Sequence, residues 1–152
     1  GSSHFAEHPP SGLSNVAVCV NFDMIGRLRD NKLILQGVGS SSVWRRLIEK
    51  RNVAAGFNLT LQDDPYLPTD VTAFYPKGVP VVNFFTGSHD DYHRPTDRPD
   101  TLDYEGTERI ARFAEGILLD LVRADARPDY LTVARSDSGG GGRESGVAGD
   151  RA

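Results

Sequence analysis

Apolar and polar positions along the chain form blocks that predict strands and helices in alternation. Two continuous apolar runs rich in β-branched residues, Val16 to Phe22 and Val79 to Phe85, are typical of strands covered on both faces. Two shorter segments, Lys32 to Gln36 and Asn58 to Leu61, also predict strands. Helical patterns separate these strands, and this alternation favours an α/β fold.

Two amphipathic helices and one short helix are expected between and after the strands. One of the serines from Ser40 to Ser42 can cap the first helix, and Asp103 can cap the second, longer one. Thr69 can begin the short helix, which Pro76 and Gly78 would end. The long helix should bury Ile110, Phe113, Ile117, Leu118 and Leu121, and expose Arg109, Arg112, Glu115 and Asp120.

The composition changes after residue 125. We predict one domain over residues 1–125 and a flexible tail or linker over 126–152, because the stretch from Ser136 to Gly142 contains only Ser, Asp and Gly. The net charge of −4, without a basic run, argues against nucleic acid and anionic membranes as partners. No apolar stretch is long enough to span a membrane. The lone Cys19 lies in a predicted strand and is expected to be a small core residue.

The loop after the second apolar run concentrates chemically active side chains. Residues Thr86 to Asp97 include two histidines, three aspartates and a tyrosine. His89 and His93 are four positions apart, as in the helical HExxH zinc motif, but Gly87 and Pro95 favour a loop over a helix. A metal site at the end of a buried strand is favoured, and a polar surface loop is the alternative.

Asp23 follows the first apolar run. In open α/β sheets, ligands bind beyond the carboxyl ends of the strands, which is where Asp23 is expected to lie. Its carboxylate can ligate a metal, cap a turn or pair with Arg27. Taken alone, the residue type favours capping or ion pairing over metal binding.

Two motifs read together resemble a known enzyme family. NFDMIGR (Asn21–Arg27) and TGSHDDYHRPTD (Thr86–Asp97), with PTDVTAFYPKGVPVVNFF between them, resemble the di-zinc exopeptidases of the twenty-eighth metallopeptidase family. The resemblance runs from Gly1 to about Arg123. It implies a mixed β-sheet sandwiched between helices. It also implies a metallopeptidase that removes N-terminal residues from peptides with a water activated by two Zn²⁺ ions.

The resemblance also implies roles for single residues. Asp23 matches the carboxylate ligand of one zinc, and His93 matches the imidazole ligand of the other. Tyr92 matches a tyrosine that hydrogen-bonds the developing oxyanion. Three further residues are expected to orient ligands or order the loop without binding metal: Asp70, Asp97 and His89.

The resemblance covers only part of the family's site. The family also needs an upstream His, a bridging Asp and a Glu-Glu pair containing the general base, and Gly1 to Phe5 matches the segment just after that pair. The chain therefore resembles the C-terminal half of a catalytic domain. Its sheet should be incomplete on the N-terminal side, and the chain alone should show little or no activity. The expected partners are a peptide substrate and either a missing N-terminal half or a second copy paired through an exposed sheet edge.

Other functions stay open at this point. The chain can be a non-catalytic half-domain or interaction module, or part of a related zinc carboxypeptidase or glutaminyl cyclase-like enzyme. A Glu-Glu pair shortly before Gly1 would favour the enzyme, and its absence the non-catalytic module. The family resemblance suggests an exported, periplasmic or extracellular protein.

Overall fold

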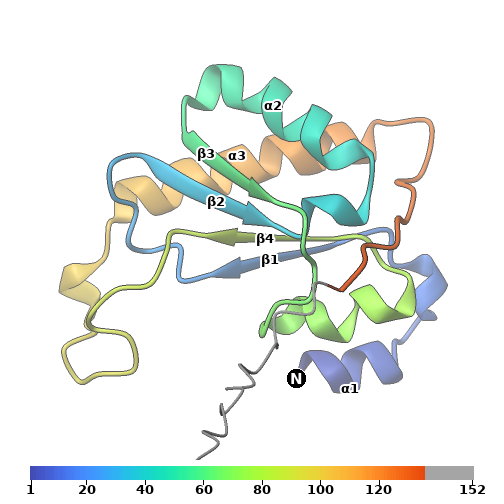
Figure 1. The fold of residues 1–152 in the computed structure, drawn as a ribbon, viewed down its shortest axis with the longest axis horizontal. Coiled ribbons are helices and arrows are strands. Elements are labelled where there is room, and N and C mark those ends of the chain that lie inside the picture. Colours follow the sequence, from blue (N-terminus) through green and yellow to red (C-terminus); the bar gives the residue numbers. More distant parts are fainter. Residues whose placement is uncertain (136–152) are drawn as a thin grey trace, which may run out of the picture.

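A four-stranded mixed sheet forms the centre of the protein (Figure 1). The structure is a computed structural model that describes residues 1–135. The strands β1 (Cys19–Asp23), β2 (Lys32–Gln36), β3 (Asn58–Gln62) and β4 (Val81–Phe85) lie in the order β1-β4-β2-β3. β1 is parallel to β4, and β2 is parallel to β3 but antiparallel to β4. The predicted α/β fold with a mixed sheet is confirmed.

Strands β1 and β4 begin later than their apolar runs, and Pro80 explains why. Only β4 is buried along most of its length, whereas the edge strand β1 is partly exposed, so the expectation that both strands are covered on both faces was wrong for β1. Proline has no N–H to donate to a sheet ladder. The Pro80 carbonyl accepts the Cys19 N–H at 2.8 Å, and the parallel register then starts with Cys19 opposite Val81. Val16 instead closes a short turn, since its N–H donates to the Leu13 carbonyl at 2.9 Å.

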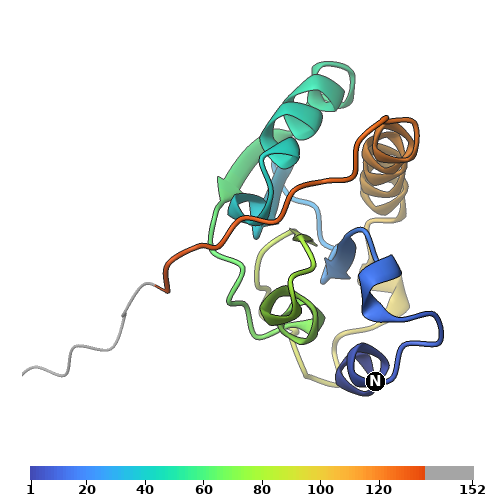
Figure 2. The same cartoon turned by 90° about the vertical axis from the view of Figure 1, so that its right-hand side faces the viewer.

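Helices cover the two faces of the sheet unequally (Figures 1 and 2). The long helices α2 (Val43–Ala55) and α3 (Tyr104–Val122) pack against each other and against one face. The short helix α1 (Ser2–Glu7) and the 3-10 helices η3 (Asp70–Ala73) and η4 (Tyr75–Lys77) lie on the other. Further 3-10 helices are η1 (Leu13–Asn15), η2 (Val38–Ser40) and η5 (Pro99–Thr101).

Alternate residues of β4 divide the apolar interior between these faces. Val82 and Phe84 belong to the core under α2 and α3, whereas Val81 packs with Val71 and Tyr75 from η3 and η4. The short helix predicted from Thr69 is thus two consecutive 3-10 helices.

A ladder of side-chain amides crosses all four strands. Asn21 donates to Asn83 at 2.9 Å, Asn83 donates to Gln36 at 2.8 Å, and Gln36 donates to Gln62 at 2.8 Å. Asn83 is fully buried, so these bonds satisfy an amide that would otherwise be costly to desolvate. Because side chains alternate between faces, the ladder fixes the register of the sheet.

Helix α3 begins where the sequence predicts, but one residue of its solvent face is placed differently. Asp103 caps the helix by accepting the Gly106 N–H at 2.9 Å. The Asp120 side chain is only 12% exposed, because Arg51 (2.9 Å) and Lys50 (3.2 Å) of α2 donate to its carboxylate. The expectation that Asp120 is solvated was therefore wrong.

Residues 126–135 have no helix or strand, yet they contact the domain. The Leu131 N–H donates to the Ser40 carbonyl at 2.8 Å, and the Val133 N–H donates to the Tyr75 hydroxyl at 2.7 Å. The Gly-rich stretch within residues 136–152 lies outside the described residues, and the flexible tail stays a prediction. Within residues 1–135, no helix has both the length and the apolar character needed to cross a membrane.

Candidate functional site

Two connections meet at one edge of the sheet, and they carry most of the predicted site residues. β1 and β4 are parallel neighbours with Asp23 opposite Phe85, so their carboxyl ends point the same way. The histidine loop, residues 86–98, follows β4, and the β1–β2 connection, residues 24–31, follows β1. Asp23, the last residue of β1, therefore lies at the same end of the sheet as the loop that carries Tyr92 and His93. Figure 1 shows this loop leaving the sheet at the ends of β1 and β4.

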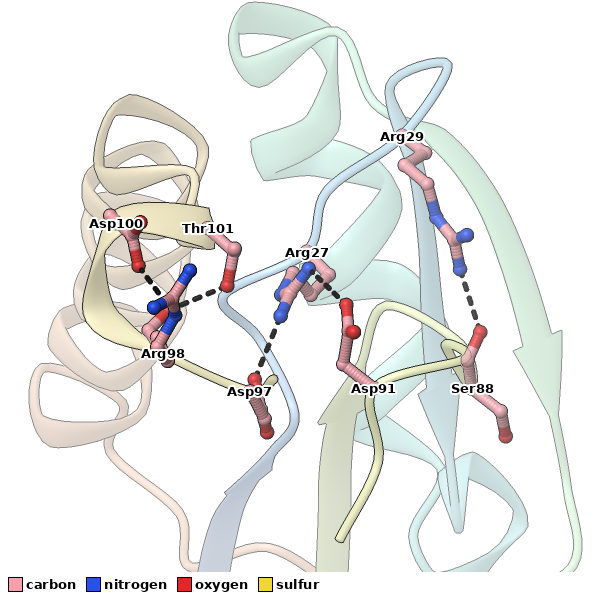
Figure 3. A network of polar contacts seen from close by, with 8 residues as sticks. All are labelled: Arg27, Arg29, Ser88, Asp91, Asp97, Arg98, Asp100 and Thr101. Atoms are coloured by element: carbon pink, nitrogen blue, oxygen red, sulfur yellow. Dashed lines mark hydrogen bonds and ion pairs between the residues drawn. The ribbon is translucent and has the colours of Figure 1, made fainter. Parts of the chain in front are cut away.

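Polar contacts join these two connections (Figure 3). Arg27 donates from Nη2 to Asp97 at 2.7 Å and from Nη1 to Asp91 at 3.2 Å. Arg29 donates from Nη2 to the Ser88 carbonyl at 2.7 Å. At the base of the loop, the Thr86 hydroxyl donates to the Met24 carbonyl. The β1–β2 connection therefore holds the histidine loop at several points along its length.

Arg27 is the centre of this network. Its side chain is only 15% exposed, and hydrogen bonding to Asp97 raises the pKa of its guanidinium. The Thr96 hydroxyl and the Arg27 guanidinium lower the pKa of Asp91, so its carboxyl stays ionised. The alternative that Arg27 pairs with Asp23 was wrong, since its carboxylate partners are Asp91 and Asp97.

The histidine loop is built from turns and not from a helix. Tyr92, Arg94 and Asp97 each donate a backbone N–H to the carbonyl three residues earlier, at 3.2, 2.8 and 3.0 Å. His93 has a left-handed backbone with φ of 57°, as does Met24 with φ of 52°. Such backbones cost roughly 1–2 kcal/mol in a residue with a side chain. Strain of this kind next to Asp23 and at His93 is a common feature of functional sites.

The ring of Tyr92 lies beside those of His93 and His89. The Tyr92 and His93 ring centroids are 3.9 Å apart, and His89 meets Tyr92 edge-on at 6.4 Å. Tyr92 is half exposed, and His93 is exposed, so a ligand can reach both. His89 is partly buried, and its Nδ1 has no hydrogen-bond partner among the described residues.

A pocket of about 360 Å³ opens beside these rings. It lies between the histidine loop, the β1–β2 connection and the approach to α3. Its walls are Met24, Gly26, Arg27, His89, Tyr92, His93, Arg94, Asp97 and Leu102.

Asp70 is the one predicted site residue that lies elsewhere. It is in η3, near α1, and its carboxylate accepts the Ser2 hydroxyl. Figure 1 shows this region at the end of the sheet opposite the histidine loop. Burial, together with the charge of Asp70, raises the pKa of Cys19 to about 11. The Cys19 thiol is therefore un-ionised at neutral pH, as a small core residue should be.

The described residues fit part of a zinc centre. Zinc in proteins takes three or four side-chain ligands, usually His, Cys, Asp or Glu. Within residues 1–135, no three such side chains lie close enough together to hold a metal ion. Asp23 and His93 have the right donor atoms, but two ligands do not complete the centre.

Sequence reasoning missed the two arginines that organise the site. Arg27 was considered only as a partner of Asp23, and Arg29 was not considered, whereas both reach across to the histidine loop. The available signal was charge: two arginines follow β1, and three aspartates follow β4.

The fold is similar to that of several solved aminopeptidases. The Legionella pneumophila LapA aminopeptidase matches with a TM-score of 0.66 and 19% identity over 80% of this chain and 35% of that one. BSAP, a zinc aminopeptidase from Bacillus subtilis, matches with a TM-score of 0.66 and 21% identity over 88% of this chain and 36% of that one. An aminopeptidase from Aneurinibacillus sp. strain AM-1 matches with a TM-score of 0.65 and 20% identity over 90% of this chain and 32% of that one.

These matches show the fold, and the chain spans about a third of the length of those structures. No curated protein sequence matches this chain significantly. Residues 1–118 match the sequence profile of Peptidase family M28. The chain therefore belongs to Peptidase family M28.

Proposed function

We propose that this chain supplies part of the active site of a zinc aminopeptidase that hydrolyses N-terminal residues from peptides. One observation carries the proposal. Asp23 and the loop bearing Tyr92 and His93 come to the same edge of the sheet because β1 and β4 are parallel neighbours. Membership of Peptidase family M28 supports the same function.

The proposed roles follow from side-chain chemistry. Asp23 would hold one zinc ion through its carboxylate, and His93 would hold the other through its imidazole. Bound zinc supplies a Lewis acid and lowers the pKa of a water molecule. Tyr92 donates a hydrogen bond to the oxygen on which negative charge develops, which stabilises the transition state more than the bound peptide.

The remaining ligands and the general base have to come from outside residues 1–135. The free edge of β1 is the proposed joining surface. Within the described residues, β1 pairs only with β4, and Phe22 on this edge strand is 44% exposed. The opposite edge strand, β3, exposes the polar residues Asn58, Thr60 and Gln62. The proposed occupant of the β1 edge is an N-terminal half of the domain, with a second copy of this chain as the alternative.

Zinc stoichiometry per chain, after dialysis against buffered zinc, tests this proposal. The variants are Asp23→Asn and His93→Ala, and the control is His4→Ala. The control matters because His4 and His8 stack with their ring centroids 4.7 Å apart and can bind zinc adventitiously. We expect weak binding that is lost in Asp23→Asn and His93→Ala and kept in His4→Ala.

The outcomes separate the candidate functions. Two tightly held ions that depend on His93 would mean that the chain or its oligomer completes the site, and leucine-anilide hydrolysis should then be measurable. Weak binding without turnover is the expected result for part of a site. Binding that ignores both Asp23 and His93 would contradict the proposal. It would favour a non-catalytic module, in agreement with the lack of a three-ligand cluster within residues 1–135.

A further inference from the structure

We propose that Arg27 is a positioning residue that fixes where Tyr92 and His93 lie relative to Asp23. This inference rests on the proposed function, since it concerns residues assigned to the same site. Arg27 reaches Asp91 and Asp97 at the same time, from the connection that immediately follows Asp23.

The two contacts bracket the residues that matter. Asp91 directly precedes Tyr92 and His93, and Asp97 follows them at the end of the same run of turns. Arg27 itself follows Asp23 by one turn of chain. One side chain therefore links the segment carrying the carboxylate ligand to both ends of the segment carrying the imidazole ligand.

Guanidinium geometry suits this task. Arginine presents several N–H donors in a rigid plane and can bind two carboxylates through different nitrogens, whereas lysine offers a single point charge. Nη1 and Nη2 of Arg27 each take one carboxylate. Lysine at this position would keep the charge but lose the two-point contact.

Burial makes the contact more effective than an ordinary surface ion pair. The Arg27 side chain is 15% exposed, and its partners Asp91 and Asp97 are 33% and 38% exposed. Solvent and salt screen such a pair less than a fully exposed one. The surface pair of Arg45 and Asp63 has the same 2.7 Å contact as Arg27 and Asp97 but is 50% and 57% exposed, so it serves as a matched control.

The histidine loop has little else to hold its outer half. It contains no helix or strand, and its own backbone bonds are isolated turns. Two contacts fix the beginning of the loop: Arg29 donates to the Ser88 carbonyl, and the Thr86 hydroxyl donates to the Met24 carbonyl. Beyond them, Arg27 makes the polar side-chain contacts between the β1–β2 connection and the segment containing Tyr92 and His93.

Hydrogen exchange on the metal-free chain is the first test, because it needs neither zinc nor activity. The variants are Arg27→Lys, Arg27→Gln and Asp97→Asn, and the control is Arg45→Gln. We expect faster exchange across residues 88–98 in the first three, with α2 and β3 unchanged. Arg45→Gln should leave residues 88–98 as in the wild type.

Cobalt titration, followed by visible absorption, then tests the effect on the ligands. Loss of a group that orients a metal ligand lowers metal affinity by about 10- to 100-fold. We expect a decrease of that size at His93 in Arg27→Lys and Asp97→Asn, and no change in Arg45→Gln.

Several results would overturn the inference. Unchanged exchange in residues 88–98, or wild-type behaviour of Arg27→Lys, would show that the two-point contact does not position the loop. Faster hydrogen exchange with unchanged cobalt affinity would show that Arg27 orders the loop without positioning the His93 imidazole for metal binding. If the wild type binds no cobalt through His93, the proposed function fails for this chain. The hydrogen-exchange comparison then still tests whether Arg27 positions the loop. If Arg27 variants do not fold, Asp97→Asn and Asp91→Asn on the loop itself decide the question.

Discussion

The Asp129 carboxylate accepts the backbone N–H of Ser42 at 3.0 Å, at the start of α2. The same oxygen accepts the hydroxyls of Ser41 at 2.7 Å and of Ser42 at 2.9 Å. Ser42 itself makes no side-chain cap bond. The helix is thus capped by a residue from far along the chain, and a negative charge there also suits the positive end of the helix.

This contact predicts that residues 126–135 stabilise the domain. A chain ending at residue 125 loses the Asp129 cap and the Leu131 bond to Ser40, so its Tm should fall below that of a chain ending at 135. Asp129→Ala should account for part of the loss. Thermal unfolding of the two truncated chains and the full chain checks this. Equal Tm values for the chains ending at 125 and 135 would instead support a domain boundary at residue 125.

The Asp103 cap of α3 predicts a measurable stability change. Removing an aspartate N-cap costs about 1 kcal/mol, because one helix N–H loses its acceptor. Asp103→Ala should therefore lower the free energy of unfolding by about that amount, as measured in urea. Asp125→Ala, at an exposed aspartate beyond the helix, is the control and should leave the free energy unchanged.

Gly106 in the same helix should not tolerate alanine, although alanine is the better helix former. A Cβ at Gly106 would lie 2.2 Å from Asp103 Oδ2 and 2.9 Å from Leu28 Cβ. Overpacking of this kind costs roughly 1–3 kcal/mol, which exceeds the gain in helix propensity. In an Asp103→Ala background the loss should be smaller, and a double-mutant cycle measures the difference. Additive effects would contradict the clash with the carboxylate.

The Asp120 ion pairs predict a stability change with pH. Hydrogen bonding to Arg51 is the main reason that the pKa of Asp120 falls from 3.8 to about 2. A carboxyl group whose pKa is lowered by folding stabilises the folded state at pH values above its ordinary pKa of 3.8. This contribution is lost as pH falls towards about 2. The Tm difference between wild type and Asp120→Asn should therefore be constant above pH 3.8 and shrink below it. Asp125→Asn should show no such trend.

Cys19 should titrate late and react slowly. Burial is the main cause that raises its pKa from 9.0 to about 11. The partly buried neutral thiol contributes stability below pH 9.0, and this contribution is lost as pH rises towards about 11. Ultraviolet absorbance of the thiolate, compared in native and urea-unfolded chain, measures both values. If the thiolate of the native chain forms near pH 9.0, the burial of Cys19 does not raise its pKa and the prediction is wrong.

Local sequence patterns predicted the strands and long helices well, because buried elements repeat their apolar positions. Lys32–Gln36 and the Asp103 cap appear in the structure as expected. The errors arose where a distant residue decides the outcome. Pro80 delays the start of β1 through a neighbouring strand, and Asp129 joins Ser41 in accepting backbone N–H groups at the start of α2.

The candidate site was predictable only as a set of motifs. The two motifs placed Asp23 at a strand end and His93 in the loop after a strand, and parallel pairing of β1 with β4 brings that end and that loop to the same side of the sheet. The partner choice of Arg27 was not readable, because the sequence contains several nearby carboxylates and gives no distances. The position of Asp70 was equally hidden, since it depends on which end of the sheet η3 covers.

The amide ladder across the sheet bears on the order in which the molecule folds. Its Gln36–Gln62 rung joins residues 26 positions apart, whereas its Asn21–Asn83 rung joins residues 62 apart. Each doubling of loop length raises the free-energy cost of closing the loop by about 0.6 kcal/mol. The shorter loop, which contains α2 and joins β2 to β3, is therefore favoured to close first. We therefore expect the pairing of β1 with β4, which brings Asp23 to the same end of the sheet as the histidine loop, to form later. Partial unfolding should accordingly open the candidate site while the β2–α2–β3 unit remains intact.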